Sequence, residues 1–494
     1  MISALEAARI AEHYGLEGTA FALAGEYDLN FRLETRGQTF LLKIAANGSD
    51  RELLEYQNAV MNHIASRAPQ LDSQRVIANV AGELICEITL QGETRLMRLL
   101  TYAPGRTLAA SKPHTKELLE SLGERLAQMD VALEGFTHEK ASRPYKWNLA
   151  QADEMIPLLE QIDSASRRTI AEQHLTRFSN DLKSQIAQLP AGVIHSDAND
   201  YNVIVTGTGF DARVSSVIDF GDAVHSPIIC DLAIALAYTM LGKPDPVASA
   251  SHVVRGYHRV RPLLEAELKV LYPLVLTRLA VSVCNSANEK RLRPDDAYAV
   301  ISEAPAWALL EHLEKIHENL ATGIFRTACN LEPIPNAILV REWLLEHQAE
   351  FGRIVDVDLK SEKLEVFDLS VASTDLGLPD EIDTVEKFTK RLFNQMRDND
   401  ARVGVGRYLE PRIIYANDDF VVPSENSPER RSMHMAHDYF LLAGEPVFAP
   451  IAGTVHSFQD NTAELDYGPC IILEHQVLHR GQSITFYKIG RAHV

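Results

Sequence analysis

The stretch Val193-Ile194-His195-Ser196-Asp197-Ala198-Asn199-Asp200-Tyr201-Asn202, followed by Val217-Ile218-Asp219-Phe220-Gly221-Asp222, decides the fold of this chain. It has the spacing His-x-Asp-x-x-x-x-Asn, and a further Asp ends an apolar run about 20 residues later, an order typical of a base followed by two metal ligands. β-Branched residues on both sides predict that the motifs lie between short strands.

Phosphoryl transfer explains why these residue types occur in this order. The protein must hold an acceptor hydroxyl in line and neutralise charge on the phosphates through magnesium. The pattern therefore predicts a catalytic pair, Asp197 with His195, in which Asp197 accepts or orients the hydroxyl proton. Asn202 and Asp219 are the predicted magnesium ligands. Either motif alone could arise by chance, but both in this order favour the functional interpretation.

Bulk properties exclude several classes of protein. The 494 residues suffice for two to four domains. A net charge of -20 argues against a nucleic-acid or acidic-membrane partner. Five scattered cysteines without a C-x-x-C pair suit a reducing compartment. No leader-like start and no apolar run of membrane-spanning length are evident, so we expect a cytoplasmic protein.

Residues 101–105, with a Pro-Gly turn, are predicted to cross over between two lobes. The region before this crossover is predicted to form a sheet with two helices. Helices are predicted over 4–14 and 51–65, and strands over 20–36 (two, around Gly25-Glu26-Tyr27-Asp28), 39–45, 76–78, 84–88 and 94–100. The first hairpin either covers a nucleotide or is an ordinary hairpin. Lys43 is costly to bury unless it is paired, and we predict that it grips nucleotide phosphates. Gln57, with Glu52 and Glu55 nearby, stands where a glutamate partner for Lys43 is usual.

Helical periodicity follows the crossover and persists to about residue 322. It includes helices over 118–133 and 178–189, and another that starts at 227–233, in which Asp231 is predicted to be a helix-end charge or a loop anchor. A strand-rich connector is expected over 326–400.

The motif 193–202, together with Arg98-Leu99-Leu100-Thr101-Tyr102-Ala103-Pro104-Gly105, resembles the aminoglycoside phosphotransferase and choline kinase superfamily, and within it the hydroxylysine kinase branch. The resemblance covers residues 1–325. It implies an α+β, two-lobed, protein-kinase-like fold with an N-lobe over 1–102 and a helical C-lobe over 103–325. It also implies ATP or GTP as donor, a hydroxylysine- or ethanolamine-like amino alcohol as acceptor, and binding roles for Lys43, Asn202 and Asp219.

Residues 401–487 resemble the lysostaphin-like zinc metallopeptidase domain, which is mostly β. The resemblance rests on 431–440, on Gly444-Glu445-Pro446-Val447, on Gly453-Thr454-Val455 and on Tyr467-Gly468-Pro469. It implies that His434 and Asp438 are zinc ligands and that His475 matches a histidine of catalytic type. An imidazole and a carboxylate suit zinc.

We expect this last domain to be truncated. The family's third ligand follows a strand such as Thr485-Phe486-Tyr487, but here 488–494 follow, a tail that we interpret as artefactual, so His493 is not taken as a ligand. A kinase followed by such a domain resembles a three-part architecture whose last part is an aminotransferase-like domain, absent from this chain.

Three alternatives remain open at this point. The chain could be an aminoglycoside (antibiotic) phosphotransferase, a zinc metalloendopeptidase, or a non-catalytic binding module through its C-terminal domain. For the leading interpretation, Asp200 and Asp222 are candidates to bind the ammonium group of the acceptor, because they lie next to the catalytic motifs.

Overall fold

The computed structural model describes residues 2–23, 25, 28–90, 92–293, 303–378, 381–382, 384–416, 420–422, 429–462 and 468–491. Glu26, Tyr27, Tyr467 and His493, named above, lie outside these ranges. The chain divides into two compact units, Met1–Ile334 and Pro335–Val494, and each is described by itself.

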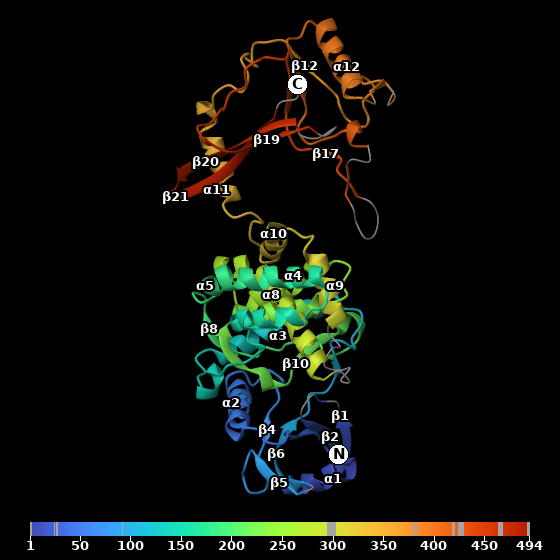
Figure 1. Ribbon diagram of the computed structural model, residues 1–494, viewed down its shortest axis with the longest axis vertical. Helices are drawn as coiled ribbons and strands as arrows, with labels where there is room; N and C mark the ends of the chain where they lie inside the picture. The colour runs from blue at the N-terminus through green and yellow to red at the C-terminus, as the bar shows by residue number, and fades with distance from the viewer. Residues whose placement is uncertain are drawn as a thin grey trace. The chain divides into compact units, whose positions relative to one another are not determined.

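An antiparallel six-stranded sheet forms the N-terminal lobe of the first unit (Figure 1). The order is β1-β2-β3-β6-β4, and β5 pairs with β6. The strands lie close to their predicted positions: β1 (Gly18–Leu23), β2 (Leu29–Thr35), β3 (Thr39–Ile44), β4 (Val76–Ile77), β5 (Cys86–Leu90) and β6 (Glu93–Thr101).

The alternation of side chains in β3 determines where its lysine lies. Leu42 and Ile44 are fully buried in a core that α1 (Ala4–Ile10) and the 3-10 helix η1 (Ala11–Tyr14) cover. Successive strand residues point to opposite faces, so Leu41 and Lys43 face the other way, toward α2 (Arg51–Arg67). Leu41 packs against the main core, to which α2 also contributes. Lys43 is thereby directed to the side of the sheet on which the second lobe packs.

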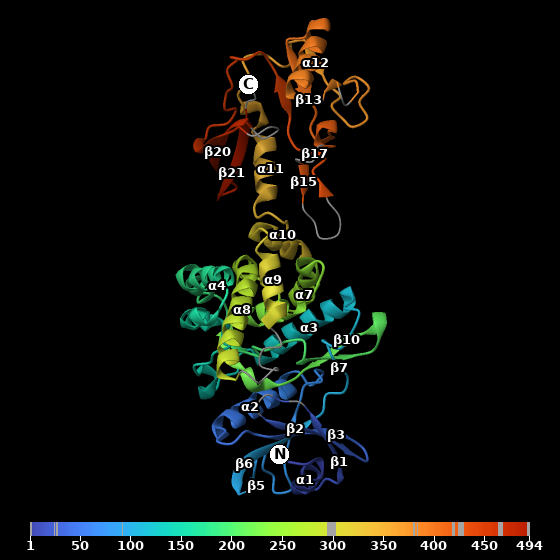
Figure 2. The same cartoon turned by 45° about the vertical axis from the view of Figure 1, so that its right-hand side comes forward.

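The second lobe is helical, and α8 is its central element (Figure 2). α8 packs against η3, α4, α6, α9 and α10. The helices are α3 (Lys116–Leu133), η3 (Leu149–Gln161), α4 (Ala165–Arg177), α5 (Lys183–Ile186), α6 (Ile229–Thr239), α7 (Pro246–Val260), α8 (Glu265–Leu292), α9 (Glu303–Leu313) and α10 (Glu318–Ala328).

The expectation that no apolar run reaches membrane-spanning length was wrong. By length and composition α8 qualifies as a candidate membrane span, and 94% of its most apolar window is buried inside the protein. Its apolarity follows from packing on all sides, since a helix surrounded by other helices has no polar face.

Two small sheets carry the predicted catalytic segments. β8 (Ala191–Ile194) pairs with β11 (Val224–Pro227), and β9 (Val203–Thr206) pairs with both β7 (Arg106–Thr107) and β10 (Arg213–Val217). Val203 is opposite Val217 in the antiparallel register. Asn202, just before β9, and Ile218, just after β10, therefore meet at one end of the sheet, and Ile218 N donates to Asn202 O at 2.9 Å.

The second unit is rich in β-structure in its C-terminal half. Its sheets pair β12 with β13 and β13 with β18, β14 with β17, β15 with β16, and β19 with β20 and β20 with β21. The strands are β12 (Leu364–Val366), β13 (Val403–Gly406), β14 (Glu410–Pro411), β15 (Val421–Val422), β16 (Glu429–Arg430), β17 (Met433–His434), β18 (Asp438–Phe440), β19 (Thr454–Asn461), β20 (Gly468–His479) and β21 (Gln482–Arg491).

The prediction of a strand-rich connector over 326–400 was wrong. In the part of this range that the structure describes, α10 runs across residue 325, and α11 (Ala337–Glu346) and α12 (Val385–Asp398) accompany the single strand β12. Phe388, Leu392 and Met396 recur every four residues and pack with Phe367 in a local core. This is the spacing of one helical face, and the Thr384 side chain caps the helix.

Two glycines allow α3 and α7 to pack closely. A Cβ added to Gly123 would lie 1.9 Å from Val253 O, and one added to Gly256 would lie 1.9 Å from Glu120 O. Both obstacles are backbone atoms, so the helices would have to separate to admit a methyl group.

We therefore expect Gly123→Ala to lower the free energy of unfolding by about 3 kcal/mol, because overpacking against backbone cannot be relieved by a rotamer change. Denaturant unfolding of the full chain measures this. Gly37→Ala is the control, since nothing lies within 4 Å of its added Cβ. Equal midpoints for the two variants would contradict the prediction.

Candidate functional site

His195 joins the two segments that carry the sequence motifs. Its ring is fully buried, Nε2 lies 3.0 Å from Ile218 O, and Asp197 N donates to Nδ1 at 3.2 Å. Because Nδ1 accepts a hydrogen bond, Nε2 carries the ring proton and donates a hydrogen bond to Ile218 O. Both nitrogens are thus used by backbone. The predicted catalytic role of His195 is corrected to a positioning role, since the ring has no nitrogen left for the acceptor.

Asp231 anchors the loop that carries Asp197. Ser196 is buried at a φ of 67°, a conformation that non-glycine residues seldom adopt. Its N donates to Asp231 Oδ1 at 2.7 Å, from the first turn of α6. The loop-anchor role predicted for Asp231 is confirmed. A buried carboxylate that accepts a backbone hydrogen bond can stabilise such a strained turn.

A second buried acid, Asp130 of α3, lies beside Asp231. Tyr257 OH donates to Asp130 Oδ2 at 2.6 Å. Burial raises the pKa of Asp130 well above its usual value, and the neighbouring Asp231 raises it further. Burial also raises the pKa of Asp231, but its hydrogen bond from Ser196 N lowers it, so Asp130 holds its proton to higher pH than Asp231 does.

The Asp197 carboxylate has one oxygen held by amides. Asn199 and Asn202 donate to Oδ2 at 2.9 and 2.7 Å, and the same nitrogen of Asn202 reaches Asp197 O at 3.0 Å. The other oxygen, Oδ1, lies 3.7 Å from Nη2 of Arg278 on α8. The side chain is 19% exposed, so an incoming hydroxyl can reach it.

The surroundings of Asp197 favour proton uptake. Burial raises the pKa of Asp197 well above its ordinary value, Asp222 raises it further, and Arg278 opposes the shift. Burial also raises the pKa of Asp222, although Tyr145 donates a hydrogen bond to its carboxylate. A carboxylate whose pKa is moved toward neutrality is a better general base at physiological pH.

Lys43 and Asp219, 176 residues apart in the sequence, meet in the structure. Lys43 Nζ lies 3.3 Å from Asp219 Oδ2 and 3.7 Å from Asp28 Oδ2, and the lysine is 9% exposed. Lys43 holds the pKa of Asp219 below its usual value. The two carboxylates offset the cost of burying the ammonium group.

Helix α2 does not supply the glutamate partner of Lys43 that is usual at this position. Gln57 does not contact Lys43; its Oε1 accepts from Nη2 of Arg98 at 2.8 Å, and Asn58 Oδ1 accepts from Nη1 at 3.0 Å. Arg98 is opposite Lys43 in the β3–β6 register and is 3% exposed. Glu52 instead pairs with Lys140 at 2.8 Å. The α2 helix is therefore tied to β6 through arginine and two amides.

The residues predicted to hold magnesium fit that ion. Asn202 spends its amide nitrogen on Asp197, which leaves its oxygen to face a cation. The Asp219 side chain is 47% exposed. The backbone of Asp219 has a φ of 66° and directly follows Ile218, which is hydrogen-bonded to Asn202. Magnesium prefers such carboxylate and amide oxygens. Asn202 and Asp219 would hold the ion, which neutralises phosphate charge when it is bound.

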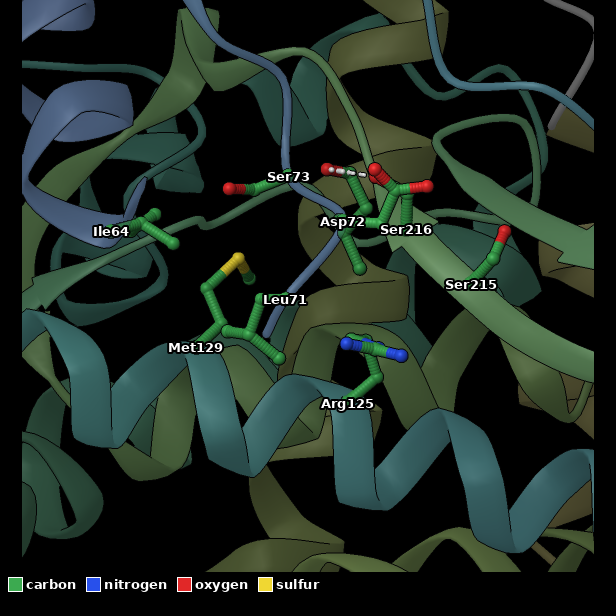
Figure 3. A pocket seen from close by; sticks show the side chains of 9 residues that line it. Ile64, Leu71, Asp72, Ser73, Arg125, Met129, Ser215 and Ser216 are labelled. Atoms are coloured by element: carbon green, nitrogen blue, oxygen red, sulfur yellow. Dashed lines mark hydrogen bonds between the residues drawn. The ribbon is translucent and has the colours of Figure 1, made fainter. Parts of the chain in front are cut away.

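A cavity behind this region does not belong to the site (Figure 3). It lies between α2, α3 and β10, and Figure 3 labels its lining residues, among them Ile64, Met129 and Ser216. Its volume of about 10 Å³ admits at most one water molecule. It is a packing defect rather than a ligand site.

Comparison with known proteins agrees with this geometry. Residues 19–267 match the group described as the phosphotransferase enzyme family. The chain belongs to this family. The match includes Lys43, Asp197, Asn202 and Asp219, and it makes the chain a kinase that acts on a hydroxyl group.

Individual relatives of this phosphotransferase are small-molecule kinases. It is 29% identical to hydroxylysine kinase of Mus musculus over 331 residues, covering 62% of this chain and 87% of that protein. It is 27% identical to homoserine kinase of Brucella anthropi over 312 residues, covering 60% and 86%. Among solved structures, an amicoumacin kinase with AMP-PNP and Ca2+ is 17% identical with a TM-score of 0.46, covering 59% of this chain and 88% of that one.

Sequence reasoning missed Arg278 and Tyr145, both of which contact the acids of this phosphotransferase site. Neither belongs to a motif. A signal existed for Arg278: it is a lone charge in the apolar run Leu274–Leu279 of α8, and such a charge is costly to bury without a partner. No comparable signal marked Tyr145.

In the second unit, His434 and Asp438 come together, but with an arginine. His434 Nε2 lies 3.3 Å from Asp438 Oδ2, and Tyr415 OH lies 2.8 Å from His434 Nδ1. Arg412 donates to the same Oδ2 of Asp438. Burial tends to raise the pKa of Asp438, but His434 and Arg412 lower it below its usual value.

These residues do not fit a zinc site. Structural and catalytic zinc takes at least three protein ligands, and no group of three or more His, Cys, Asp or Glu suited to a metal occurs among the residues described. The Arg412 guanidinium already supplies positive charge to Asp438. His475 is buried elsewhere in this unit, with Nδ1 2.8 Å from Ala452 O and its ring stacked on Phe486.

The buried Asp130 generates a prediction about pH. A folded-state pKa raised above the unfolded value contributes stability that is present at low pH and is lost as pH rises through the folded pKa. Asp130→Asn keeps an acceptor for Tyr257 without a titrating proton. We expect the variant to gain stability relative to wild type as pH rises from about 5 to 8, by up to about 1.4 kcal/mol per pH unit.

Urea unfolding at several pH values measures this difference. The Tyr257→Phe variant is the control, since it removes the hydrogen bond but leaves the titrating carboxyl in place. A constant difference between Asp130→Asn and wild type across this range would show that Asp130 is already ionised in the folded protein.

Proposed function

We propose that the chain moves the γ-phosphate of ATP or GTP, with magnesium, to the hydroxyl of a small amino alcohol. The observation that carries this proposal is the Asp197 carboxylate. Its Oδ2 is fixed by two amides, while Oδ1 accepts no hydrogen bond from the described residues and can take the proton of an acceptor hydroxyl. Asp219 and Lys43 form the neighbouring charged pair.

Lys43 is assigned to the nucleotide phosphates. It is the cation of the sheet that meets Asp219, and phosphates arriving with magnesium would replace its two carboxylate partners. Asn202 and Asp219 would hold the magnesium. The choice between ATP and GTP follows from the assay below.

The acceptor we propose is hydroxylysine- or ethanolamine-like. The names of two relatives, hydroxylysine kinase and homoserine kinase, specify acceptors with an amine and a hydroxyl. An ammonium group needs a carboxylate near the base, and Asp222 is close enough to Asp197 to raise its pKa. Asp200 is less suited, because Lys112 is its neighbouring cation. We therefore assign the ammonium group to Asp222.

The test is nucleoside diphosphate release with ATP or GTP and with hydroxylysine, homoserine, ethanolamine, choline or kanamycin as acceptor. We expect turnover with a small amino alcohol. Asp197→Asn should lower kcat by roughly 10²- to 10⁴-fold with little change in nucleotide affinity, because only the base is lost.

Asp211→Asn, a change of an exposed acid of the same lobe, is the control and should leave kcat unchanged. Preferred turnover of kanamycin would favour the aminoglycoside phosphotransferase alternative. Wild-type rates in Asp197→Asn would exclude Asp197 as the base.

For the second unit we propose a non-catalytic binding role in place of a zinc metalloendopeptidase. The lysostaphin-like resemblance of 401–487 supports the domain type, and the Arg412–Asp438–His434 contacts favour a metal-free site.

We expect the purified full chain, incubated with zinc and then dialysed, to retain less than stoichiometric zinc, because only two ligands meet there. Elemental analysis measures the content, and His434→Ala should not change it. One zinc per chain that His434→Ala removes, together with peptide cleavage that a chelator abolishes, would restore the peptidase alternative.

A further inference from the structure

Arg278 is a deeply buried cation close to the catalytic loop. Its side chain is 2% exposed, and it lies in the middle of α8, the central helix of its lobe. An isolated buried charge is strongly unfavourable. A guanidinium is therefore retained at this position only if its partners compensate for the lost hydration.

The partners hold the guanidinium in one orientation. Nη2 donates to Tyr238 OH at 3.1 Å, and Nη1 donates to Trp147 O at 3.3 Å. The Trp147 ring lies 4.8 Å from the guanidinium carbon and the Tyr238 ring lies 5.6 Å from it. Aromatic faces stabilise a cation at such distances. These neutral groups fix the position of Arg278 but do not balance its charge.

Asp222 attracts Arg278 more weakly, and the nearest balancing charge is Asp197. Its Oδ1 lies 3.7 Å from Nη2, which is too long for a hydrogen bond but short enough for strong attraction in a buried setting. Oδ1 therefore keeps its lone pairs for an acceptor hydroxyl. The amides of Asn199 and Asn202 fix the opposite oxygen.

We propose that Arg278 is a positioning residue for phosphoryl transfer. Its charge attracts Asp197 Oδ1 and so keeps that oxygen oriented toward the acceptor hydroxyl. The inference rests on the proposed role of Asp197 as base. Direct contact of Arg278 with the acceptor is disfavoured, because a side chain that is 2% exposed offers almost no surface to a ligand.

The test compares Arg278→Ala, Arg278→Gln and Arg278→Lys in the full chain. We expect Arg278→Ala and Arg278→Gln to lower kcat on the order of 10²-fold, with the acceptor KM and nucleotide affinity little changed, because a displaced base costs about this much. Arg278→Lys restores the charge and should recover most of the loss. About 20 mM guanidinium, far below denaturing concentrations, should raise the activity of Arg278→Ala at least several-fold.

Arg326→Ala is the matched control. Arg326 is also a buried arginine of this lobe, but it pairs with Glu265 and with Glu332 O rather than with the catalytic loop. The folded variant should keep the wild-type kcat and gain nothing from guanidinium.

Each other outcome has one meaning. An inactive wild type overturns the proposed function itself. With an active wild type, a folded Arg278→Ala that keeps its kcat overturns the positioning role. A raised acceptor KM at constant kcat would instead make Arg278 an acceptor-binding residue. If Arg278→Ala does not fold, Arg278→Lys and Arg278→Gln decide: equal kcat values for these two would contradict a role that depends on charge.

Discussion

The hydrogen bond from His195 Nε2 to Ile218 O is the interaction on which the site depends. It joins the segment that ends in Asn202 to the segment that ends in Asp219, and the antiparallel pairing of Val203 with Val217 continues the connection. A fully buried neutral imidazole can bridge two backbones because one nitrogen donates and the other accepts. Asp197, Asn202 and Asp219, which have different proposed roles, are thereby brought to one end of a small sheet.

The acids below this junction show how the fold accommodates negative charge. Asp231 is buried and Asp197 and Asp222 are half-buried, and each has a partner suited to its position: Asp197 has two amides and Arg278, and Asp222 has Tyr145. Asp231 has the backbone of Ser196. Buried polar groups are tolerated when their hydrogen bonds are made. Oδ1 of Asp197 accepts no hydrogen bond from the described residues and so remains available for chemistry.

The sheet solves a related problem with two cations. Lys43 and Arg98 are opposite each other on β3 and β6, and both are buried. Two neighbouring cations repel each other, and the carboxylates of Asp28 and Asp219 offset this repulsion by attracting both groups. Lys43 pairs directly with these carboxylates, whereas the hydrogen bonds of Arg98 go to the neutral amides of Gln57 and Asn58. Helix α2 is thus fixed without using the lysine, which remains directed at Asp219.

The sequence by itself was enough to pick out those site residues whose positions follow from local chain geometry. A loop of fixed length between two short strands places Asp197 and Asn202, and the apolar runs around them predict those strands. The apolar residues on both sides of the lone lysine in 39–45 likewise singled out Lys43. It also indicated Asp231 as an anchor, because helix ends attract acidic side chains.

Only the tertiary structure decided which distant groups meet. Arg278, Tyr145 and Asp130 come from separate helices and loops, and no local rule relates them to 195–202. The pairing of Gln57 with Arg98 rather than with Lys43 depends on strand register, and Arg412, just after β14, reaches Asp438 of β18. Pairing of buried charges is settled by three-dimensional proximity, because electrostatic attraction depends on distance and burial rather than on sequence separation.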